Sequence, residues 1–178
     1  YYASRGLGDV YKRQHDGEIM RILDACCGSR MFWHEKELSF VDYQDNRSLS
    51  TTLCDGRKLE IKPSLMGDVT DMFYIKDGTY DMVVFDPPHL KNGGDNAWII
   101  LKYGRLPEEW KSFMKTAFEE CFRVLKDGGT LVFKWNSEQI PFAEVVKLSP
   151  YKPIFGDKRA KTRWTVFVKD SALRRNGI

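Results

Sequence analysis

The sequence predicts an α/β fold built on a doubly wound, mostly parallel sheet, and three observations carry this prediction. Residues 82–85 form an apolar, β-rich run that is too short for a helix, as expected of a strand buried on both faces. Residues 20–24 are typical of a strand and lead into small residues, where such a sheet places its first ligand loop. Two strands near the end of the chain are joined by a link so short that they must be antiparallel.

Length and composition limit the class of protein. The chain has 178 residues, of which 42% are hydrophobic, enough for one domain with an ordinary core. No window approaches the roughly 18 apolar residues of a membrane span, and no secretory leader is recognisable, so we expect a cytoplasmic protein. The spacing of Cys26, Cys27, Cys54 and Cys121 fits neither a zinc site nor a disulfide framework, so no metal is expected.

The first fourteen residues differ from the rest because they lead into no strand or helix pattern. Residues 9–14 resemble a translated sequencing adapter, so we expect 1–14 to be a non-native, disordered leader and 15–178 to form a single domain. Without this leader the formal net charge falls from +3 to +1. Net charge then gives no independent support for a nucleic-acid partner.

The first half of the chain is expected to alternate strands with short connections. Its predicted sheet strands are 20–24, 40–47 and 63–68. Residues 31–38 are expected to form a short helix. Asp55-Gly56 is a hairpin signal between 50–53 and 58–61, so we expect an inserted β-hairpin where a crossover helix would normally lie.

The second half contains the central strand and the clearest helix. Its predicted strands are 82–85, 130–135, 151–155 and 163–169, with a shorter helix at 138–148 and a basic turn at 156–161. The clearest helix opens at Pro107 and is expected to end at Lys126-Asp127-Gly128-Gly129, with glycine after its last turn. Residues 90–104 contain Gly93-Gly94 and predict a hinge followed by a short helix or lid over the site.

Acidic residues end three successive strands, at Asp45, Asp68 and Asp86. The carboxyl ends of parallel strands share one edge of the sheet, where open α/β folds bind ligands, so these side chains should converge. Asp45 lies roughly 20 residues beyond the small-residue loop, the separation at which an acid binds the ribose hydroxyls of an adenosine. Asp42 is the alternative candidate for that role.

This order of elements resembles the class I S-adenosylmethionine-dependent methyltransferases, a Rossmann-like family, over nearly the whole chain after Gln14. The run Leu-Lys-Asp-Gly-Gly-Thr-Leu at 125–131 is similar to that family's junction between a helix and the fifth strand. A terminal antiparallel strand pair is the family's closing feature. The resemblance implies S-adenosyl-L-methionine as cofactor. The implied cofactor-binding residues are Asp24, Ala25, Cys26, Gly28, Asp45, Asp68 and Asp86.

Asp86-Pro87-Pro88-His89 resembles the Asp/Asn-Pro-Pro-aromatic motif of amino-methyltransferases, and the pattern is similar to that of small phage-type DNA methyltransferases. In that family the carboxylate or amide and the first proline carbonyl accept hydrogen bonds from an NH₂ group, and the aromatic ring stacks on a base swung out of its duplex. The resemblance implies that Asp86, Pro87, Pro88 and His89 form the methyl-acceptor site. His89 departs from the motif, because its ring is smaller and can become charged.

We therefore expect a methyltransferase that acts on an exocyclic amino group of a DNA base. RNA, a protein glutamine, and a non-catalytic binding module that kept the fold are the alternatives. Sequence specificity, where present, would come from residues 90–104 and from the basic turn around Lys158 and Arg159.

Overall fold

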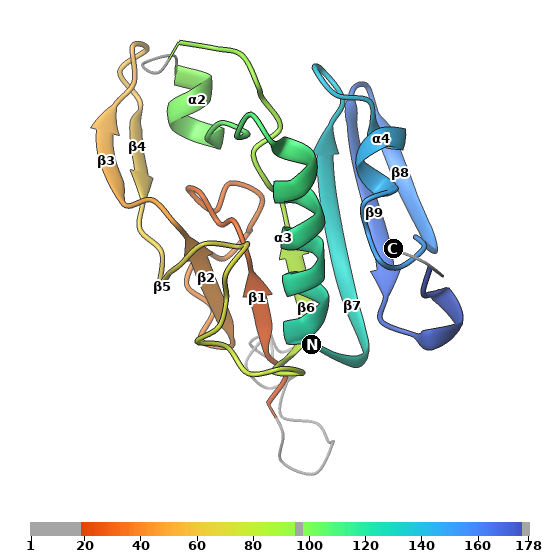
Figure 1. Ribbon diagram of the computed structural model, residues 1–178. Helices are drawn as coiled ribbons and strands as arrows, with labels where there is room; N and C mark the ends of the chain where they lie inside the picture. The colour runs from red at the N-terminus through yellow and green to blue at the C-terminus, as the bar shows by residue number, and fades with distance from the viewer. Residues whose placement is uncertain (1–18, 95–97, 176–178) are drawn as a thin grey trace, which may run out of the picture.

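The computed structural model describes residues 19–94 and 98–175 (Figure 1). Its strands are β1 (Ile22–Asp24), β2 (Val41–Asp45), β3 (Leu49–Thr52), β4 (Lys58–Ile61), β5 (Leu65–Met66), β6 (Tyr80–Phe85), β7 (Leu125–Asn136), β8 (Phe155–Arg159) and β9 (Thr162–Val168). Its helices are α2 (Trp98–Tyr103), α3 (Trp110–Val124), α4 (Phe142–Val146) and the 3₁₀ turn η1 (Ser171–Leu173). The expected leader, 1–14, lies outside the described residues.

Seven strands form one sheet in the order β5-β2-β1-β6-β7-β9-β8. The first five in this order pair in parallel, whereas β9 runs antiparallel to both β7 and β8. Strands β3 and β4 pair only with each other, as an antiparallel hairpin around Asp55-Gly56. The predicted fold class is confirmed: a Rossmann-like, mostly parallel sheet with a terminal antiparallel strand pair and an inserted β-hairpin.

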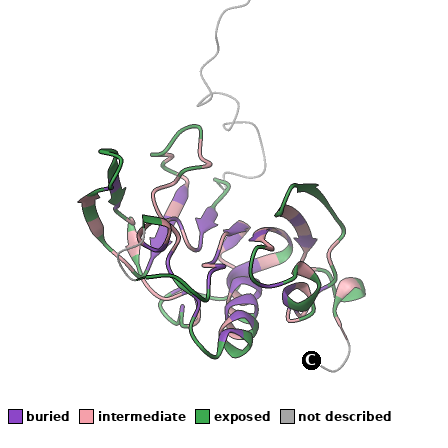
Figure 2. Ribbon diagram, turned by 90° about the horizontal axis from the view of Figure 1, so that it is seen from above, coloured by how far each residue is buried: buried purple, intermediate pink, exposed green. Residues whose placement is uncertain are grey.

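The main hydrophobic core lies between the sheet and α3, which lies in front of β6 and runs roughly along the strands (Figure 1). The apolar residues of α3 recur at helical spacing, so they form one stripe that faces the strands. Phe118 is fully buried at the centre, with its ring 5.3 Å from that of Phe85 and 5.0 Å from that of Phe133. Seen from above, burial is concentrated in the inner strands and in α3, while the hairpin is largely exposed (Figure 2).

The helix expected at 31–38 is not formed, and this segment consists of turns and bends. Side-chain contacts explain the difference. Arg30 donates hydrogen bonds to the carbonyls of Lys36 and Lys62, and Trp33 Nε1 donates to Asp24 Oδ2 at 2.7 Å. These bonds hold the segment flat against the second face of the sheet, where Phe32 and Trp33 pack on the strands.

The end of α3 was predicted too late in the chain. The helix ends at Val124, and Leu125 is already extended at φ −79°, ψ 136°. The backbone N–H groups of Gly78 and Thr79 donate to the carbonyls of Arg123 and Val124. These bonds satisfy the last helical carbonyls, so no glycine cap is needed and β7 begins at once.

The strand expected at 151–155 lies later in the chain, as β8. Tyr151 packs its ring 4.5 Å from that of Phe122, so its apolar surface serves the core rather than a strand. The expected basic turn at 156–161 is therefore mostly strand, closed by Ala160 at φ 52° and Lys161. The helix expected at 138–148 is confined to α4.

Helix α2 and the hairpin stand side by side at the carboxyl edge of the parallel strands, the upper edge in Figure 1. Leu101 of α2 packs against the hairpin residues Leu53, Leu59 and Ile61. Together they form a wall above the edge where the acidic strand ends meet. In the described part of the chain, none of the helices has the length and apolarity needed to cross a membrane.

Candidate functional site

Two adjoining cavities lie at the carboxyl edge of the sheet, between β1, β2 and β6. The larger measures about 560 Å³ and the smaller about 300 Å³, and Cys26 and Arg47 line both. We call them the edge cavity and the inner cavity. Asp45 and Asp68 line the edge cavity, whereas Asp86 lines the inner cavity. The topology thus places the three strand-end acids around one connected site.

Asp45 ties the first loop to the end of β2. Its Oδ2 accepts a hydrogen bond from the backbone N–H of Gly28 at 2.9 Å, and its Oδ1 accepts from the backbone N–H and Nε of Arg47, both at 3.0 Å. Gly28 has φ 47°, a conformation that glycine adopts at little cost. The loop therefore curls over a carboxylate that is 5% exposed and borders the edge cavity.

Asp68 and Asp42 occupy different surroundings. Asp68 accepts hydrogen bonds from Thr70 and Asn46, and although burial acts to raise its pKa, these bonds lower it below the ordinary value. Asp42 Oδ2 accepts from Arg21 and from the hydroxyl of Tyr80, and Asp42 lines neither cavity of the site. Of the two candidates for ribose binding, Asp45 is the one at the edge cavity.

Asp86 forms an ion pair with Lys134 of β7, whose Nζ lies 2.6 Å from Asp86 Oδ2. Both side chains are largely buried, at 12% and 21% exposure. Burial raises the pKa of Asp86, and the ammonium group of Lys134 opposes that rise. Among the described residues, Asp86 Oδ1 accepts no hydrogen bond. Asp86 lines the inner cavity with one carboxylate oxygen that has no partner in the described part of the chain.

The two prolines after Asp86 differ in their position relative to the cavities. Pro88 lines the edge cavity, whereas Pro87 is buried, and within the described ranges its carbonyl accepts no hydrogen bond. Gly104, at φ 76°, passes so close that a Cβ there would lie 3.2 Å from Pro88 Cγ. This close approach allows α2 to end directly above the Asp-Pro-Pro turn.

His89 is buried, at 7% exposure, and does not line either cavity. Its ring lies 5.4 Å from that of Tyr103 and 6.4 Å from that of Trp135. Burial, and then the charge of Lys134, lower the pKa of His89 to about 4, so the imidazole is neutral at physiological pH. Tyr103, rather than His89, presents a ring to the inner cavity.

The remaining predicted site residues lie on β1 and its loop. Asp24 is fully buried beneath the loop, where Trp33 donates to Oδ2 and Oδ1 has no partner in the described part of the chain. Burial raises the pKa of Asp24 to about 7. Ala25 lines the edge cavity and Cys26 lines both cavities. Burial also raises the pKa of Cys26, which keeps the thiol protonated.

Sequence reasoning missed most residues of the inner cavity, among them Phe32, Arg47, Tyr103 and Lys134. Lys134 had a recognisable signal, because it interrupts a run of strand residues between the core side chains Phe133 and Trp135. Its Nζ also lies within 6.0 Å of the ring centres of Phe32, Tyr103 and Trp164. Nothing in the sequence brings these rings together, because they come from three separate segments.

No metal centre is formed by the residues that the structure describes, since none of their His, Cys, Asp and Glu side chains cluster in threes or more at ligating positions. The four cysteines are free thiols.

Comparisons with known proteins bear on the fold. No protein-family model matches the sequence, and a search of the curated proteins finds no match. Among solved structures, the PH0226 protein of Pyrococcus horikoshii is 16% identical and has a TM-score of 0.51, covering 83% of this chain and 81% of its own. A TehB-like SAM-dependent methyltransferase of Corynebacterium glutamicum is 14% identical, with a TM-score of 0.48, and covers 84% and 80%. At 16% identity the likeness to the PH0226 protein concerns the fold alone.

Proposed function

We propose that this protein is an S-adenosylmethionine-dependent methyltransferase that methylates an exocyclic amino group of a DNA base. One observation carries the proposal. In the turn Asp86-Pro87-Pro88, Asp86 lines the inner cavity and Pro88 lines the edge cavity, and two oxygens of the turn, Asp86 Oδ1 and the Pro87 carbonyl, accept no hydrogen bond from the described residues. An NH₂ group has two N–H donors, which two such acceptors can satisfy.

The edge cavity suits the adenosine half of the cofactor. Asp45 and Asp68 supply carboxylates at the ends of β2 and β5, where hydroxyl groups of a ribose can donate to them. Val69, Pro88 and Phe113 supply apolar surface for the adenine ring. When bound, S-adenosylmethionine supplies a methyl group on a positively charged sulfonium. The inner cavity adjoins this site through Cys26, so the methyl donor and the acceptor can meet beside Asp86.

The chain's own contribution at the acceptor is orientation. Hydrogen bonds from the amino group to Asp86 Oδ1 and the Pro87 carbonyl would turn the nitrogen lone pair toward the edge cavity. The negative charge on these two oxygens would stabilise the positive charge that develops on the nitrogen. Lys134 holds Asp86 through Oδ2, so the carboxylate keeps one fixed rotamer. In this scheme Lys134 is a positioning residue, because it acts through Asp86.

The rings of Tyr103 and Phe32 line the inner cavity and are the candidates for stacking on the base. Base–aromatic stacking contributes about 1 to 3 kcal/mol per base. His89, the expected stacking group, lines neither cavity, and its ring lies 5.4 Å from that of Tyr103. The proposal therefore keeps His89 in the site as a packing partner of Tyr103.

The test is methyl transfer from labelled S-adenosylmethionine to DNA, RNA and a glutamine-containing peptide. We expect label in DNA, and we expect Asp86→Ala to abolish transfer while calorimetry still finds cofactor binding. Label in RNA or in the peptide alone would move the proposal to that substrate. Full turnover by Asp86→Ala would refute the assignment of this residue, and absence of cofactor binding by the wild type would favour a non-catalytic binding module.

A further inference from the structure

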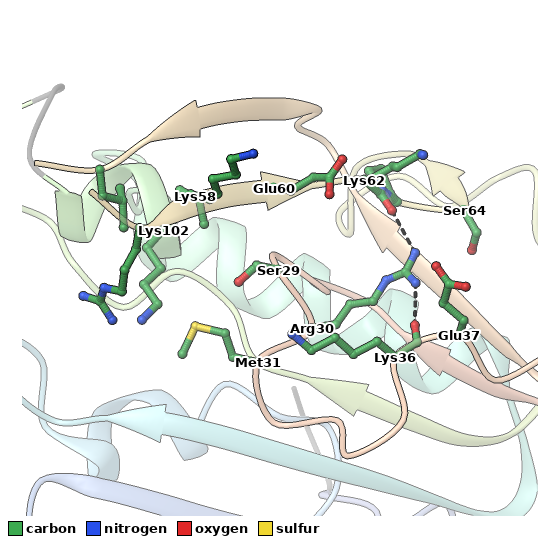
Figure 3. A pocket seen from close by; sticks show the side chains of 14 residues that line it. Ser29, Arg30, Met31, Lys36, Glu37, Lys58, Glu60, Lys62, Ser64 and Lys102 are labelled. Atoms are coloured by element: carbon green, nitrogen blue, oxygen red, sulfur yellow. Dashed lines mark hydrogen bonds between the residues drawn. The ribbon is translucent and has the colours of Figure 1, made fainter. Parts of the chain in front are cut away.

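A third cavity, of about 640 Å³, opens between the hairpin β3–β4, the loop after β1 and helix α2 (Figure 3). We call it the basic groove. One wall is β4 with the residues that follow it, and the opposite wall is the flat segment 29–37 that replaces the expected helix. The groove therefore exists because a hairpin was inserted after β2 and because Arg30 pins the segment 29–37 to the sheet.

Positive charge dominates the lining of the groove. Its basic residues are Arg30, Lys36, Arg57, Lys58, Lys62 and Lys102, whereas its acidic residues are Glu37 and Glu60. Arg57 is paired with Asp55, and Arg30 is occupied by two backbone carbonyls. Within the described ranges the four lysines make no ion pair, and only Glu37 and Glu60 contribute negative charge to the lining, so its balance is positive.

The basic groove is continuous with the inner cavity, because Ser29, Met31 and Lys102 line both. A ligand in the groove would have its negative charges beside Lys58 and Lys62 and would reach the inner cavity past Lys102. At that point it meets the rings of Phe32 and Tyr103. Cationic walls that lead to aromatic rings are the combination by which proteins hold a nucleic-acid strand, with phosphates on the cations and a base stacked on a ring.

We propose that the basic groove binds the phosphate backbone of the nucleic-acid strand whose base enters the inner cavity. This inference rests on the proposed function for the identity of the inner cavity as the acceptor site. Lysine ammonium groups bind phosphates as point charges. The hairpin thus acts as the nucleic-acid-binding arm of this protein. It lies on the opposite side of the acceptor site from the β-strand pair β8–β9.

The experiment measures binding of a labelled single-stranded oligodeoxynucleotide of mixed sequence by fluorescence anisotropy over a range of salt concentrations. The groove variant is Lys58→Ala/Lys62→Ala. The matched control is Lys115→Ala/Lys147→Ala, which also removes two exposed lysines, from α3 and from the end of α4. Polyglutamate serves as a competitor that is negatively charged, as the oligonucleotide is, but is a polypeptide without phosphates or bases.

For the groove variant we expect at least tenfold weaker binding and a salt slope lower by about 1.4, since each phosphate contact to a single strand contributes about 0.7. The control should bind as the wild type does. Equal losses in both variants, no binding by the wild type, or competition by polyglutamate as effective as that by unlabelled oligonucleotide would each overturn the inference.

This pair of experiments distinguishes failure of the groove proposal from failure of the proposed function. If no acceptor is methylated but only the groove variant loses oligonucleotide binding, the role of the basic groove is supported and the proposed function is refuted. If DNA is methylated and the groove variant behaves as the control does, the proposed function stands and the basic groove falls. Calorimetry with S-adenosylmethionine should give equal affinity for wild type and groove variant, which shows that the fold is intact.

Discussion

Replacing Lys134 by methionine tests the central ion pair of the site. The substitution keeps a long apolar stem but removes the ammonium group that lies 2.6 Å from Asp86 Oδ2. Breaking a buried ion pair from one side costs about 3 to 5 kcal/mol, because it leaves the other charge uncompensated. Lys134 and Asp86 keep 21% and 12% exposure, so water can still reach the carboxylate in part. We therefore expect the free energy of unfolding to fall by about 2 to 3 kcal/mol at pH 8.

The loss should depend on pH. Burial already raises the pKa of Asp86 above 3.8, and removal of Lys134 removes the charge that opposes this rise. A carboxyl group with a raised pKa in the folded state binds its proton more tightly there than in the unfolded state. Its contribution to stability is then present at low pH and is lost as pH rises through the interval above 3.8. The deficit of Lys134→Met should therefore be largest at pH 8 and shrink toward pH 4.

Chemical denaturation of a double-mutant cycle measures this coupling. Asp86→Asn/Lys134→Met leaves no unpaired charge, so it should recover most of the stability that Lys134→Met loses. Lys115→Met, at an exposed position of α3, is the control and should change stability by less than about 0.5 kcal/mol. Additive effects of the two single substitutions, or a pH-independent loss in Lys134→Met, would refute the reasoning.

Three further substitutions probe the walls of the site. Asp24→Asn should raise the melting temperature at pH 8, because a buried carboxyl whose pKa is raised to about 7 destabilises the fold as pH rises from 3.8 toward 7. Thermal scans at pH 5 and pH 8 measure this gain, and an equal gain at both pH values would contradict the prediction. Asp45→Asn should weaken S-adenosylmethionine binding at least tenfold by calorimetry, and unchanged affinity would exclude Asp45 from the cofactor site. Tyr103→Phe should keep methyl transfer within about threefold. Tyr103→Ala should raise the KM for DNA at least tenfold, because it loses about 1.4 kcal/mol of stacking. An equal effect of the two substitutions would argue for a role of the hydroxyl instead of the ring.

The sequence allowed the sheet to be predicted because its strands carry local signals. Residues 82–85 are continuously apolar, and Asp55-Gly56 sits between two alternating runs, so neighbouring residues alone specify β6 and the hairpin. The boundary at Leu125 depended instead on the backbone groups of Gly78 and Thr79, which are remote in sequence. Helix and strand boundaries of this kind are set by tertiary hydrogen bonds, which local residue propensities do not reveal.

The same distinction applies to the candidate site. The acids at strand ends could be placed on one edge because parallel topology brings carboxyl ends together. The inner cavity could not be foreseen, since Phe32 reaches it only because 31–38 is flat, and the flatness depends on Arg30 bonds to distant carbonyls. His89 was expected at the acceptor from its position in the motif, but it is buried and lines neither cavity, whereas Tyr103 of α2 lines the inner cavity.

Product analysis of methylated DNA tests the central claim most directly. The protein is incubated with unmethylated DNA and with S-adenosylmethionine that carries a deuterated methyl group, and the digested nucleosides are separated by mass spectrometry. The account predicts a deuteromethyl group on an exocyclic nitrogen of one base, present with the wild type and missing with Asp86→Ala. A label on a ring carbon, or equal labelling by both proteins, would contradict it.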